Sequence, residues 1–385
     1  MIPYGRQKID DEDIKAVVEV LKSDFLTQGP VVPRFERALA RYCGVPHAVA
    51  VNSATSALHI ACLALGVGPG DRVWTSPNTF VASANCARYC GASVDFVDID
   101  PHTYNMSVDA LSSRLEQAER TNALPKVVIP VHFAGQPCDM AGIRRLANRY
   151  GFRIIEDASH AIGARYADSI VGDCAYGDIT VFSFHPVKII TTAEGGVATT
   201  RSDELARRMR LLRSHGITRD TNALTRPEEG PWYYEQHCLG FNYRMTELQG
   251  ALGLSQLRHL DDWVAQRHRL ADRYDADLAS LPLILPTRVP GSYSALHLYV
   301  VQVGRKGATP SRAEVFRRLR AAGIGVNVHY IPVHRQPDFM SLGFRPGQFP
   351  VSEDYYAHCL SLPMHVSLAR SEQQIVIEAL RQALR

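Results

Sequence analysis

Short apolar runs alternate with segments of helical periodicity over the first 200 residues of the chain. This alternation is typical of parallel βαβ units that share one sheet. The apolar character of the runs is nearly continuous, which indicates that both faces of the sheet are covered. The predicted strands span residues 47–53, 71–77, 93–100, 126–135, 152–159 and 179–184. We therefore expect an α/β fold built on a parallel-rich sheet.

The periodicity changes near residue 244. Apolar residues at helical spacing predict a long helix over residues 244–281, with a break near Asp261. A strand pair is expected beyond it, at residues 294–303 and 325–333, together with helices near 311–322 and 370–384. We expect a large domain of residues 1–250 and a smaller α+β domain of residues 251–385.

Polar residues follow four of the predicted strands directly. In parallel sheets, ligands bind beyond the carboxyl ends of the strands. Candidate binding positions are therefore residues 52–56, residues 79–80, His132 and residues 157–160.

Composition excludes several classes of function. The chain has 42 basic and 39 acidic residues, a net charge of +3, which gives no electrostatic case for a nucleic acid or an anionic membrane as partner. No apolar run approaches the ~20 residues of a membrane span. The eight cysteines form no C-x-x-C pair, so no zinc or other metal site is expected. The polar, acidic start of the chain does not resemble a secretory signal, and we expect a reducing, cytoplasmic location.

The segment FSFHPVKIITTAEGG, residues 182–196, places one lysine, Lys188, between an apolar strand and a run of small residues. Taken alone, Lys188 is better explained as an exposed lysine. If its apolar neighbours desolvate the amine, the pKa falls and the amine becomes a nucleophile. Asp157, at the end of a strand, suits either a bond to a cationic ring nitrogen or the cap of the next helix.

Three further positions complete a chemical set. The junction NSATSAL, residues 52–58, offers free backbone N–H groups at a helix start, which suit a phosphate; Ser53 or Thr55 is equally well explained as a helix cap. Phe80 follows another strand and offers either an aromatic face or core packing, and His160 either orients a ligand or packs. Together with Lys188 and Asp157, these are the components of a pyridoxal phosphate (PLP) site.

Seven motifs extend this set over nearly the whole chain: LTQGP (26–30), NSATSAL (52–58), EDASHA (156–161), FSFHPVKIITTAEGG (182–196), GFNYRMTELQGALGLSQL (240–257), VHYIPVH (328–334) and LSLPMH (360–365). With them the chain resembles the DegT/DnrJ/EryC1/StrS family of nucleotide-sugar aminotransferases. The resemblance implies the PLP-dependent, aspartate-aminotransferase-like fold of type I. Many members have glycine where Ala193 stands.

The resemblance assigns roles to single residues. Lys188 matches the lysine that binds PLP covalently, Asp157 the partner of the pyridinium nitrogen, and His160 the residue beside the ring. Phe80 matches the stacking face of the ring. Asn242 matches an asparagine that reaches the phosphate from a neighbouring subunit, which implies a homodimer. The phosphate site is implied at Ala54, Thr55 and Ser183.

The same resemblance implies a substrate site. Tyr4 and residues 24–27 match the stretch that meets the sugar nucleotide, and residues 327–330 match a loop at the rim of the site. His185 and His329 are expected either to bind the sugar nucleotide or to support groups that do. The full implied set is Tyr4, Asp24, Phe25, Leu26, Thr27, Ala54, Ser183, His185, Asn242, Asn327, Val328, His329 and Tyr330.

SFHPVK, TTAEGG and VHYIPVH are most similar to family members of pseudaminic acid synthesis. The expected substrates are therefore L-glutamate, as amino donor, and a UDP-linked 4-keto-6-deoxy-N-acetylhexosamine, aminated at C4. Members acting on other dTDP- or UDP-linked 4-keto sugars share much of the sequence of these motifs.

Three other functions stay open. A PLP-dependent sugar dehydratase is disfavoured, because related dehydratases carry histidine where Lys188 stands. A non-enzymatic sensor of sugar nucleotides is disfavoured by the intact Lys188 and Asp157. An amino-acid aminotransferase of the same fold needs an arginine for the α-carboxylate, and neither Arg335 nor Arg370 stands in a recognised motif.

Overall fold

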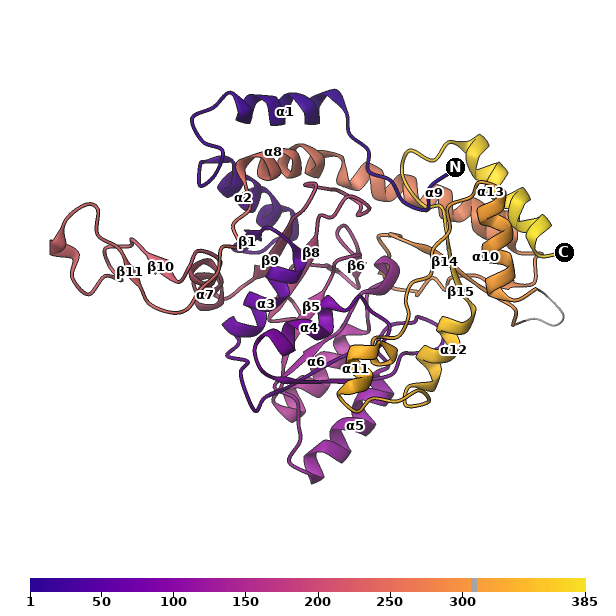
Figure 1. The fold of residues 1–385 in the computed structure, drawn as a ribbon, viewed down its shortest axis with the longest axis horizontal. Coiled ribbons are helices and arrows are strands. Elements are labelled where there is room, and N and C mark those ends of the chain that lie inside the picture. The colour runs from indigo at the N-terminus through magenta and orange to yellow at the C-terminus, as the bar shows by residue number, and fades with distance from the viewer. Residues whose placement is uncertain (306–309) are drawn as a thin grey trace.

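A seven-stranded sheet forms the centre of the computed structural model, which describes residues 1–305 and 310–385 (Figure 1). The strand order is β1-β9-β8-β5-β4-β2-β3. The strands are β1 (His47–Val51), β2 (Arg72–Thr75), β3 (Ser93–Phe96), β4 (Val127–Ile129), β5 (Arg153–Asp157), β8 (Ile179–Ser183) and β9 (Gly196–Thr200). All six predicted strands are confirmed.

Five of these strands, β3, β2, β4, β5 and β8, pair in parallel, as the sequence predicts. β9, which no pattern predicted, runs antiparallel to both β8 and β1. The reason lies in the connection: the loop between Ser183 and Gly196 contains no helix, and a parallel neighbour requires a crossover. This helix-free loop carries Lys188.

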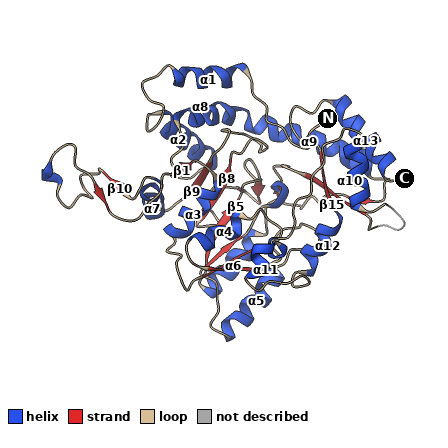
Figure 2. Ribbon diagram, in the orientation of Figure 1, coloured by secondary structure: helices blue, strands red, loops and turns tan. Residues whose placement is uncertain are grey.

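Helices cover both faces of the sheet (Figure 2). Alternate residues of a strand point to opposite faces, so Val49 and Val51 join one core while Ala48 and Ala50 join another. The first face carries α3 (Ala54–Ala64), α4 (Ala82–Tyr89) and α7 (Asp203–Arg213). The second carries α2 (Val31–Cys43), α5 (Val108–Arg120), α6 (Met140–Tyr150) and α8 (Glu247–Gln256), with α1 (Asp11–Leu21) packed on α8.

The predicted long helix is broken, as expected. α8 ends at Gln256, a 3₁₀ turn η3 (Leu257–His259) follows, and α9 (Leu260–Leu278) continues. α9, α10 (Arg312–Ala321) and α13 (Arg370–Ala383) pack around a three-stranded sheet of β12 (Leu283–Ile284), β14 (Tyr299–Val303) and β15 (Cys359–Leu362). The division at residue 250 stays a prediction.

The strand predicted at residues 325–333 is wrong. This segment makes one β-bridge, between Asn327 and Ser361, and β15 takes the place beside β14 instead. The segment leaves the sheet because Asn78 accepts the backbone N–H of Tyr330 and Pro77 that of Val333, which draws it toward the large sheet. Val328 and Tyr330 of this segment pack instead against a cluster that includes Phe133 and Tyr355.

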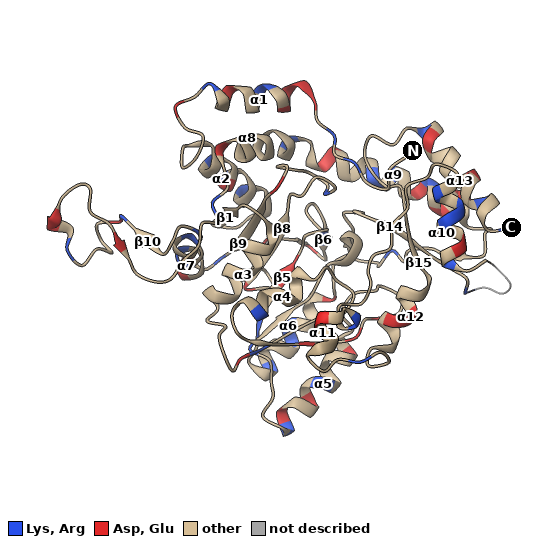
Figure 3. Cartoon of the chain, viewed as in Figure 1, with Lys and Arg blue, Asp and Glu red and all other residues tan. Residues whose placement is uncertain are grey.

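Smaller elements complete the chain: β6 (Arg165–Tyr166), β7 (Ser169–Ile170), β13 (Ser292–Tyr293), β10 (Ile217–Thr218), β11 (Glu235–Gln236), α11 (Pro337–Ser341), α12 (Pro350–His358), η1 (Phe133–Gly135), η2 (Pro227–Glu229) and η4 (Val333–Arg335). The β10–β11 pair extends away from the sheet (Figure 1). Charges of both signs are interspersed on outer helices such as α1, α5 and α13 (Figure 3). None of the helices in the described residues combines the length and apolar character that a membrane span requires.

Candidate active site

A cavity of about 610 Å³ lies beyond the carboxyl ends of β1, β2, β5 and β8. The loop after each of these strands contributes to its wall, as the strand-end rule predicts. The other wall comes from distant segments: Tyr4, His297 and residues 327–331. Residues far apart in the sequence therefore meet at one edge of the sheet.

Lys188 lies in the helix-free loop and lines the cavity. The loop is fixed on both sides of the lysine: the Lys188 N–H donates to the carbonyl of His185, at 2.9 Å, and the Thr191 N–H donates to Oε1 of Gln256, at 3.3 Å. Burial lowers the pKa of the Lys188 amine to about 8, against the opposing charge of Asp157, which raises it. With this pKa, about a tenth of the amines are neutral and nucleophilic at pH 7, against fewer than about one in a thousand for an ordinary lysine.

Asp157 lines the same cavity and is only 5% exposed. Its Oδ1 accepts the backbone N–H of Ser159, at 3.0 Å, and its Oδ2 accepts the hydroxyl of Ser83, at 2.6 Å. Each oxygen of the carboxylate therefore has one fixed hydrogen-bond donor. A buried carboxylate held in this way is a partner for a cationic group inside the cavity.

His160 is held as a neutral ring. Its Nδ1 accepts the backbone N–H of Ala134, at 3.3 Å, so the ring proton lies on Nε2 and is donated to the phenolic oxygen of Tyr330, at 3.1 Å. Burial, and then the charges of Lys188 and His329, lower the pKa of His160 well below its usual value. His160 therefore brings no positive charge to the cavity.

Two more buried histidines line the cavity. Burial, and then the charge of Lys188, lower the pKa of His329 to about 3; its Nδ1 lies 2.7 Å from the hydroxyl of Ser361. Burial, and then the charges of His160 and Lys188, lower the pKa of His297, whose ring centre lies 4.4 Å from that of His160. Lys188 is thus the cationic group on which the electrostatics of this pocket depend.

The start of α3 forms one end of the cavity, where Ala54 and Thr55 line it. Ser53 caps the helix by accepting the N–H of Ser56, at 3.1 Å, while the N–H groups of the first two helical residues have no partner within the helix. Gly196 of β9 passes so close that a Cβ there would lie 2.5 Å from the nitrogen of Ala54. Ser183 also faces this end. Such an end suits a phosphate.

The structure brings together most of the residues that the sequence predicted. Phe80 lines the cavity and is 59% exposed, so its ring is free to stack on a ligand. The predicted residues along the cavity are Tyr4, Ala54, Thr55, Phe80, Asp157, His160, Ser183, His185, Lys188, Asn327, Val328, His329 and Tyr330.

Five predicted residues do not line the cavity. Phe25 and Leu26 are 53% and 50% exposed, and Asp24, Thr27 and Asn242 are also exposed. Thr27 pairs with Thr246 in a β-bridge, so the segment around Asp24 to Thr27 lies near the start of α8. Nothing in a single chain carries these side chains to Lys188.

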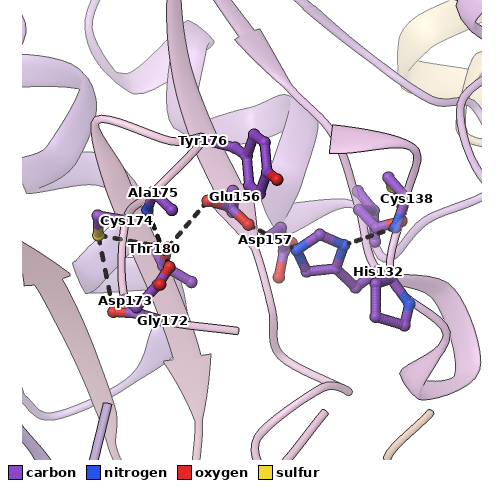
Figure 4. Close-up of polar contacts among 12 residues, drawn as sticks. His132, Cys138, Glu156, Asp157, Gly172, Asp173, Cys174, Ala175, Tyr176 and Thr180 are labelled. Atoms are coloured by element: carbon purple, nitrogen blue, oxygen red, sulfur yellow. Dashed lines mark hydrogen bonds and ion pairs between the residues drawn. The ribbon is translucent and has the colours of Figure 1, made fainter. Parts of the chain in front are cut away.

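His132 does not join the cavity, which corrects the expectation from its place after a strand. Its Nδ1 accepts the N–H of Cys138, at 3.0 Å, and its Nε2 donates to Oε2 of Glu156, at 2.9 Å (Figure 4). Glu156 also accepts the hydroxyl of Thr180, at 3.3 Å. Because neighbouring residues of a strand point to opposite faces, this network fixes β5 from the side away from Asp157.

Ser83 and His297 were missed by sequence reasoning. Ser83 lies inside helix α4 and His297 precedes β14, so neither follows a strand of the large sheet. The strand-end rule gave no signal for them.

The donor set fits PLP. An amine with a lowered pKa suits its aldehyde, the buried carboxylate of Asp157 its ring nitrogen, and the helix start at Ala54 its phosphate. The exposed ring of Phe80 suits its aromatic face.

Comparison with known proteins agrees with this chemistry. The model of the DegT/DnrJ/EryC1/StrS aminotransferase family matches residues 7–381. The chain is 41% identical over 384 residues to the spore coat polysaccharide biosynthesis protein SpsC of Bacillus subtilis, covering 99% of this chain and 96% of the relative. It is 37% identical to the UDP-4-amino-4,6-dideoxy-N-acetyl-beta-L-altrosamine transaminase of Campylobacter jejuni, with coverages of 99% and 96%.

Solved structures match over the full length. Helicobacter pylori PseC, an aminotransferase involved in the biosynthesis of pseudoaminic acid, superposes with a TM-score of 0.90 at 31% identity, covering 100% of this chain and 99% of PseC. The PLP form of the putative sugar aminotransferase Spr1654 of Streptococcus pneumoniae gives 0.88 at 31% identity, covering 99% and 98%. The expected fold class is confirmed.

Proposed function

Because the chain belongs to the DegT/DnrJ/EryC1/StrS aminotransferase family, and is thus a PLP-dependent aminotransferase of nucleotide sugars, we propose that it transfers the amino group of glutamate to C4 of a UDP-linked 4-keto-6-deoxy-N-acetylhexosamine. One observation carries the chemistry: Lys188, with a pKa of about 8, shares a cavity with the buried carboxylate of Asp157. The relatives named for pseudaminic-type sugars support the choice of sugar.

We assign the catalytic roles as the geometry suggests. When bound, PLP supplies an aldehyde that accepts the amino group and a ring that delocalises electrons. Lys188 would hold the cofactor through Nζ; once the amine of the donor has displaced Nζ, the freed amine would remove the proton from the α-carbon of the donor and, in the second half of the reaction, would deliver a proton to C4 of the sugar. Asp157 would hold the protonated ring nitrogen, and the two hydrogen bonds from Ser83 and Ser159 fix the carboxylate in place.

Other residues bind and orient. The free N–H groups at the start of α3 and the hydroxyl of Ser183 hold the phosphate. Phe80 would stack on one face of the ring, and His160, which Ala134 and Tyr330 hold in place, would lie beside it. Because His160 is neutral, it does not compete with Lys188 for a negative charge in the cavity.

The cavity wall disfavours an amino-acid aminotransferase. Lys188 is the one lysine among the described residues that line it, and no arginine is found there. Arg335 lies 4.0 Å from Glu353, and Arg370 is exposed on α13. Neither therefore places a guanidinium in the cavity where it could bind an α-carboxylate. A 4-keto sugar carries no carboxylate at its reacting carbon, whereas the carboxylates of the glutamate donor must be held by groups other than an arginine of this wall.

We also propose a homodimer. Asn242 and residues 24–27 are exposed and lie outside the cavity of their own chain. Exposed apolar side chains lie nearby in the sequence, with Trp232 at 73% and Leu239 at 80%. A second copy that covers them brings Asn242 to the phosphate end of the neighbouring site. The two-chain site then holds the sugar nucleotide at residues that a single chain leaves unused.

A second candidate is another 4-keto sugar. The chain is 38% identical over 390 residues to the GDP-perosamine synthase of Caulobacter vibrioides, covering 100% of this chain and 98% of the relative. The identities to this synthase and to the altrosamine transaminase are 38% and 37%. Sequence identity therefore does not choose between the two sugar nucleotides, and both must be assayed.

The test incubates purified protein with PLP, isotope-labelled glutamate and a panel of UDP-, dTDP- and GDP-linked 4-keto-6-deoxy sugars. We expect label at C4 of the UDP-linked N-acetylhexosamine, with the highest kcat/KM of the panel. Lys188→Ala should abolish transfer while the protein stays folded. Turnover in that variant would reject the role of Lys188, and a higher kcat/KM for a GDP-linked sugar would favour the second candidate.

A further inference from the structure

Two buried hydroxyls and a carboxylate form a chain in the cavity wall. Oγ1 of Thr79 lies 2.8 Å from Oγ of Ser83, and Oγ of Ser83 lies 2.6 Å from Oδ2 of Asp157. The three residues are 2%, 1% and 5% exposed. Solvent therefore has little access to these bonds.

The direction of the bonds follows from the chemistry of the groups. An ionised carboxylate only accepts hydrogen bonds, so Ser83 donates to Asp157. Oγ of Ser83 is then left to accept the proton of Thr79. A distance of 2.6 Å is typical of a hydroxyl that donates to a charged oxygen, which is the stronger class of hydrogen bond.

The position of Ser83 at the start of α4 directs its hydroxyl toward Asp157. Ser83 is the second residue of α4, and no side chain caps that helix start. Serine at a helix start ordinarily bonds its own backbone. Here its hydroxyl reaches across to β5 instead, and the positive end of the α4 dipole lies on the same side as the carboxylate.

We propose that Ser83 is a positioning residue of the transamination reaction: with Thr79 behind it, Ser83 fixes the rotamer of Asp157 so that the carboxylate faces the ring nitrogen of PLP. This inference rests on the proposed function. Oδ1 is held separately by the N–H of Ser159. Each carboxylate oxygen therefore has one fixed donor and one lone pair left for the cofactor.

The test uses the holoenzyme of Ser83→Ala. We expect kcat to fall about tenfold with KM changed less than about twofold, because a hydrogen bond to a charged group is lost. The absorbance spectrum of bound PLP should shift toward that of Asp157→Asn, since less of the ring nitrogen is protonated. A purely structural serine would lower stability without this spectral shift.

Ser76→Ala is the matched control. Ser76 is 2% exposed, and its hydroxyl has no hydrogen-bond partner among the described residues. It should keep the spectrum and kcat of the parent. In the Asp157→Asn background, Ser83→Ala should lower kcat by less than about twofold, because its effect passes through the carboxylate.

Thr79→Val and Thr79→Ser give a second measurement if Ser83→Ala does not fold. Only the valine variant, which lacks the hydroxyl, should lower kcat, by about threefold, and shift the spectrum. An unchanged spectrum in both Ser83→Ala and Thr79→Val, or an equal loss of kcat with and without Asp157, would overturn the inference. A parent protein that binds no PLP would instead overturn the proposed function.

Discussion

The phenolic oxygen of Tyr330 lies 3.1 Å from Nε2 of His160. His160 follows β5 of the large sheet, while Tyr330 belongs to the segment that the smaller sheet releases. The bond therefore closes the cavity between the two parts of the chain, and it fixes the position of the ring proton of His160.

Tyr330→Phe should lower kcat several-fold and the free energy of unfolding by about 1–2 kcal/mol, because Nε2–H of His160 loses its acceptor in a buried place. Steady-state kinetics and urea unfolding measure the two effects. Tyr150→Phe is the control, since the buried hydroxyl of Tyr150 has no partner among the described residues and its loss should be neutral. Equal behaviour of the two variants would contradict the role of the bond.

The reactivity of Lys188 should follow a pKa of about 8. The amine reacts only when neutral, so the rate at which PLP-free enzyme is labelled at Lys188 by PLP and borohydride should rise about tenfold from about pH 7 to about pH 9 and then level off. An ordinary lysine would still gain at pH 10. Asp157→Asn removes the charge that raises this pKa, so its profile should shift to lower pH.

Asp157→Asn should lower kcat on the order of 100-fold while the dissociation constant of PLP changes far less. The amide keeps the shape of the side chain but cannot hold the ring nitrogen protonated, whereas the phosphate contacts at α3 are untouched. Single-turnover kinetics and PLP titration separate the two quantities. A variant with the kcat of the parent would refute the assignment of Asp157.

Gly196→Ala should destabilise the protein by about 1–3 kcal/mol and weaken PLP binding, because the added Cβ would lie 2.5 Å from the nitrogen of Ala54. The added Cβ collides with backbone atoms at the phosphate end of the cavity, so neither β9 nor the start of α3 can shift without a large energetic cost. Gly68→Ala is the control, since a Cβ there meets nothing within 4 Å. The free energy of unfolding of this control, measured in urea, and its dissociation constant for PLP should equal those of the parent.

The homodimer can be tested by complementation. Lys188→Ala and Asn242→Ala should each be nearly inactive alone. If Asn242 acts across the interface, an equal mixture that exchanges subunits should regain about a quarter of the parent activity, because half of the dimers are mixed and each has one intact site. No recovery in mixtures shown to contain mixed dimers would place Asn242 in the site of its own chain.

The sequence by itself determined the α/β class, six of the seven strands of the large sheet and the residues that follow them, including Lys188, Asp157 and the start of α3. Local periodicity and the rule for strand ends suffice for these, because each depends on neighbours in the chain. Only the tertiary structure decided which distant groups share the cavity: that the segment around Tyr330 leaves its sheet, that Ser83 of helix α4 bonds Asp157 of strand β5, and that His132 turns away from the site. Those outcomes depend on packing between elements far apart in the sequence, and the desolvation that lowers the pKa of Lys188 arises from the same packing.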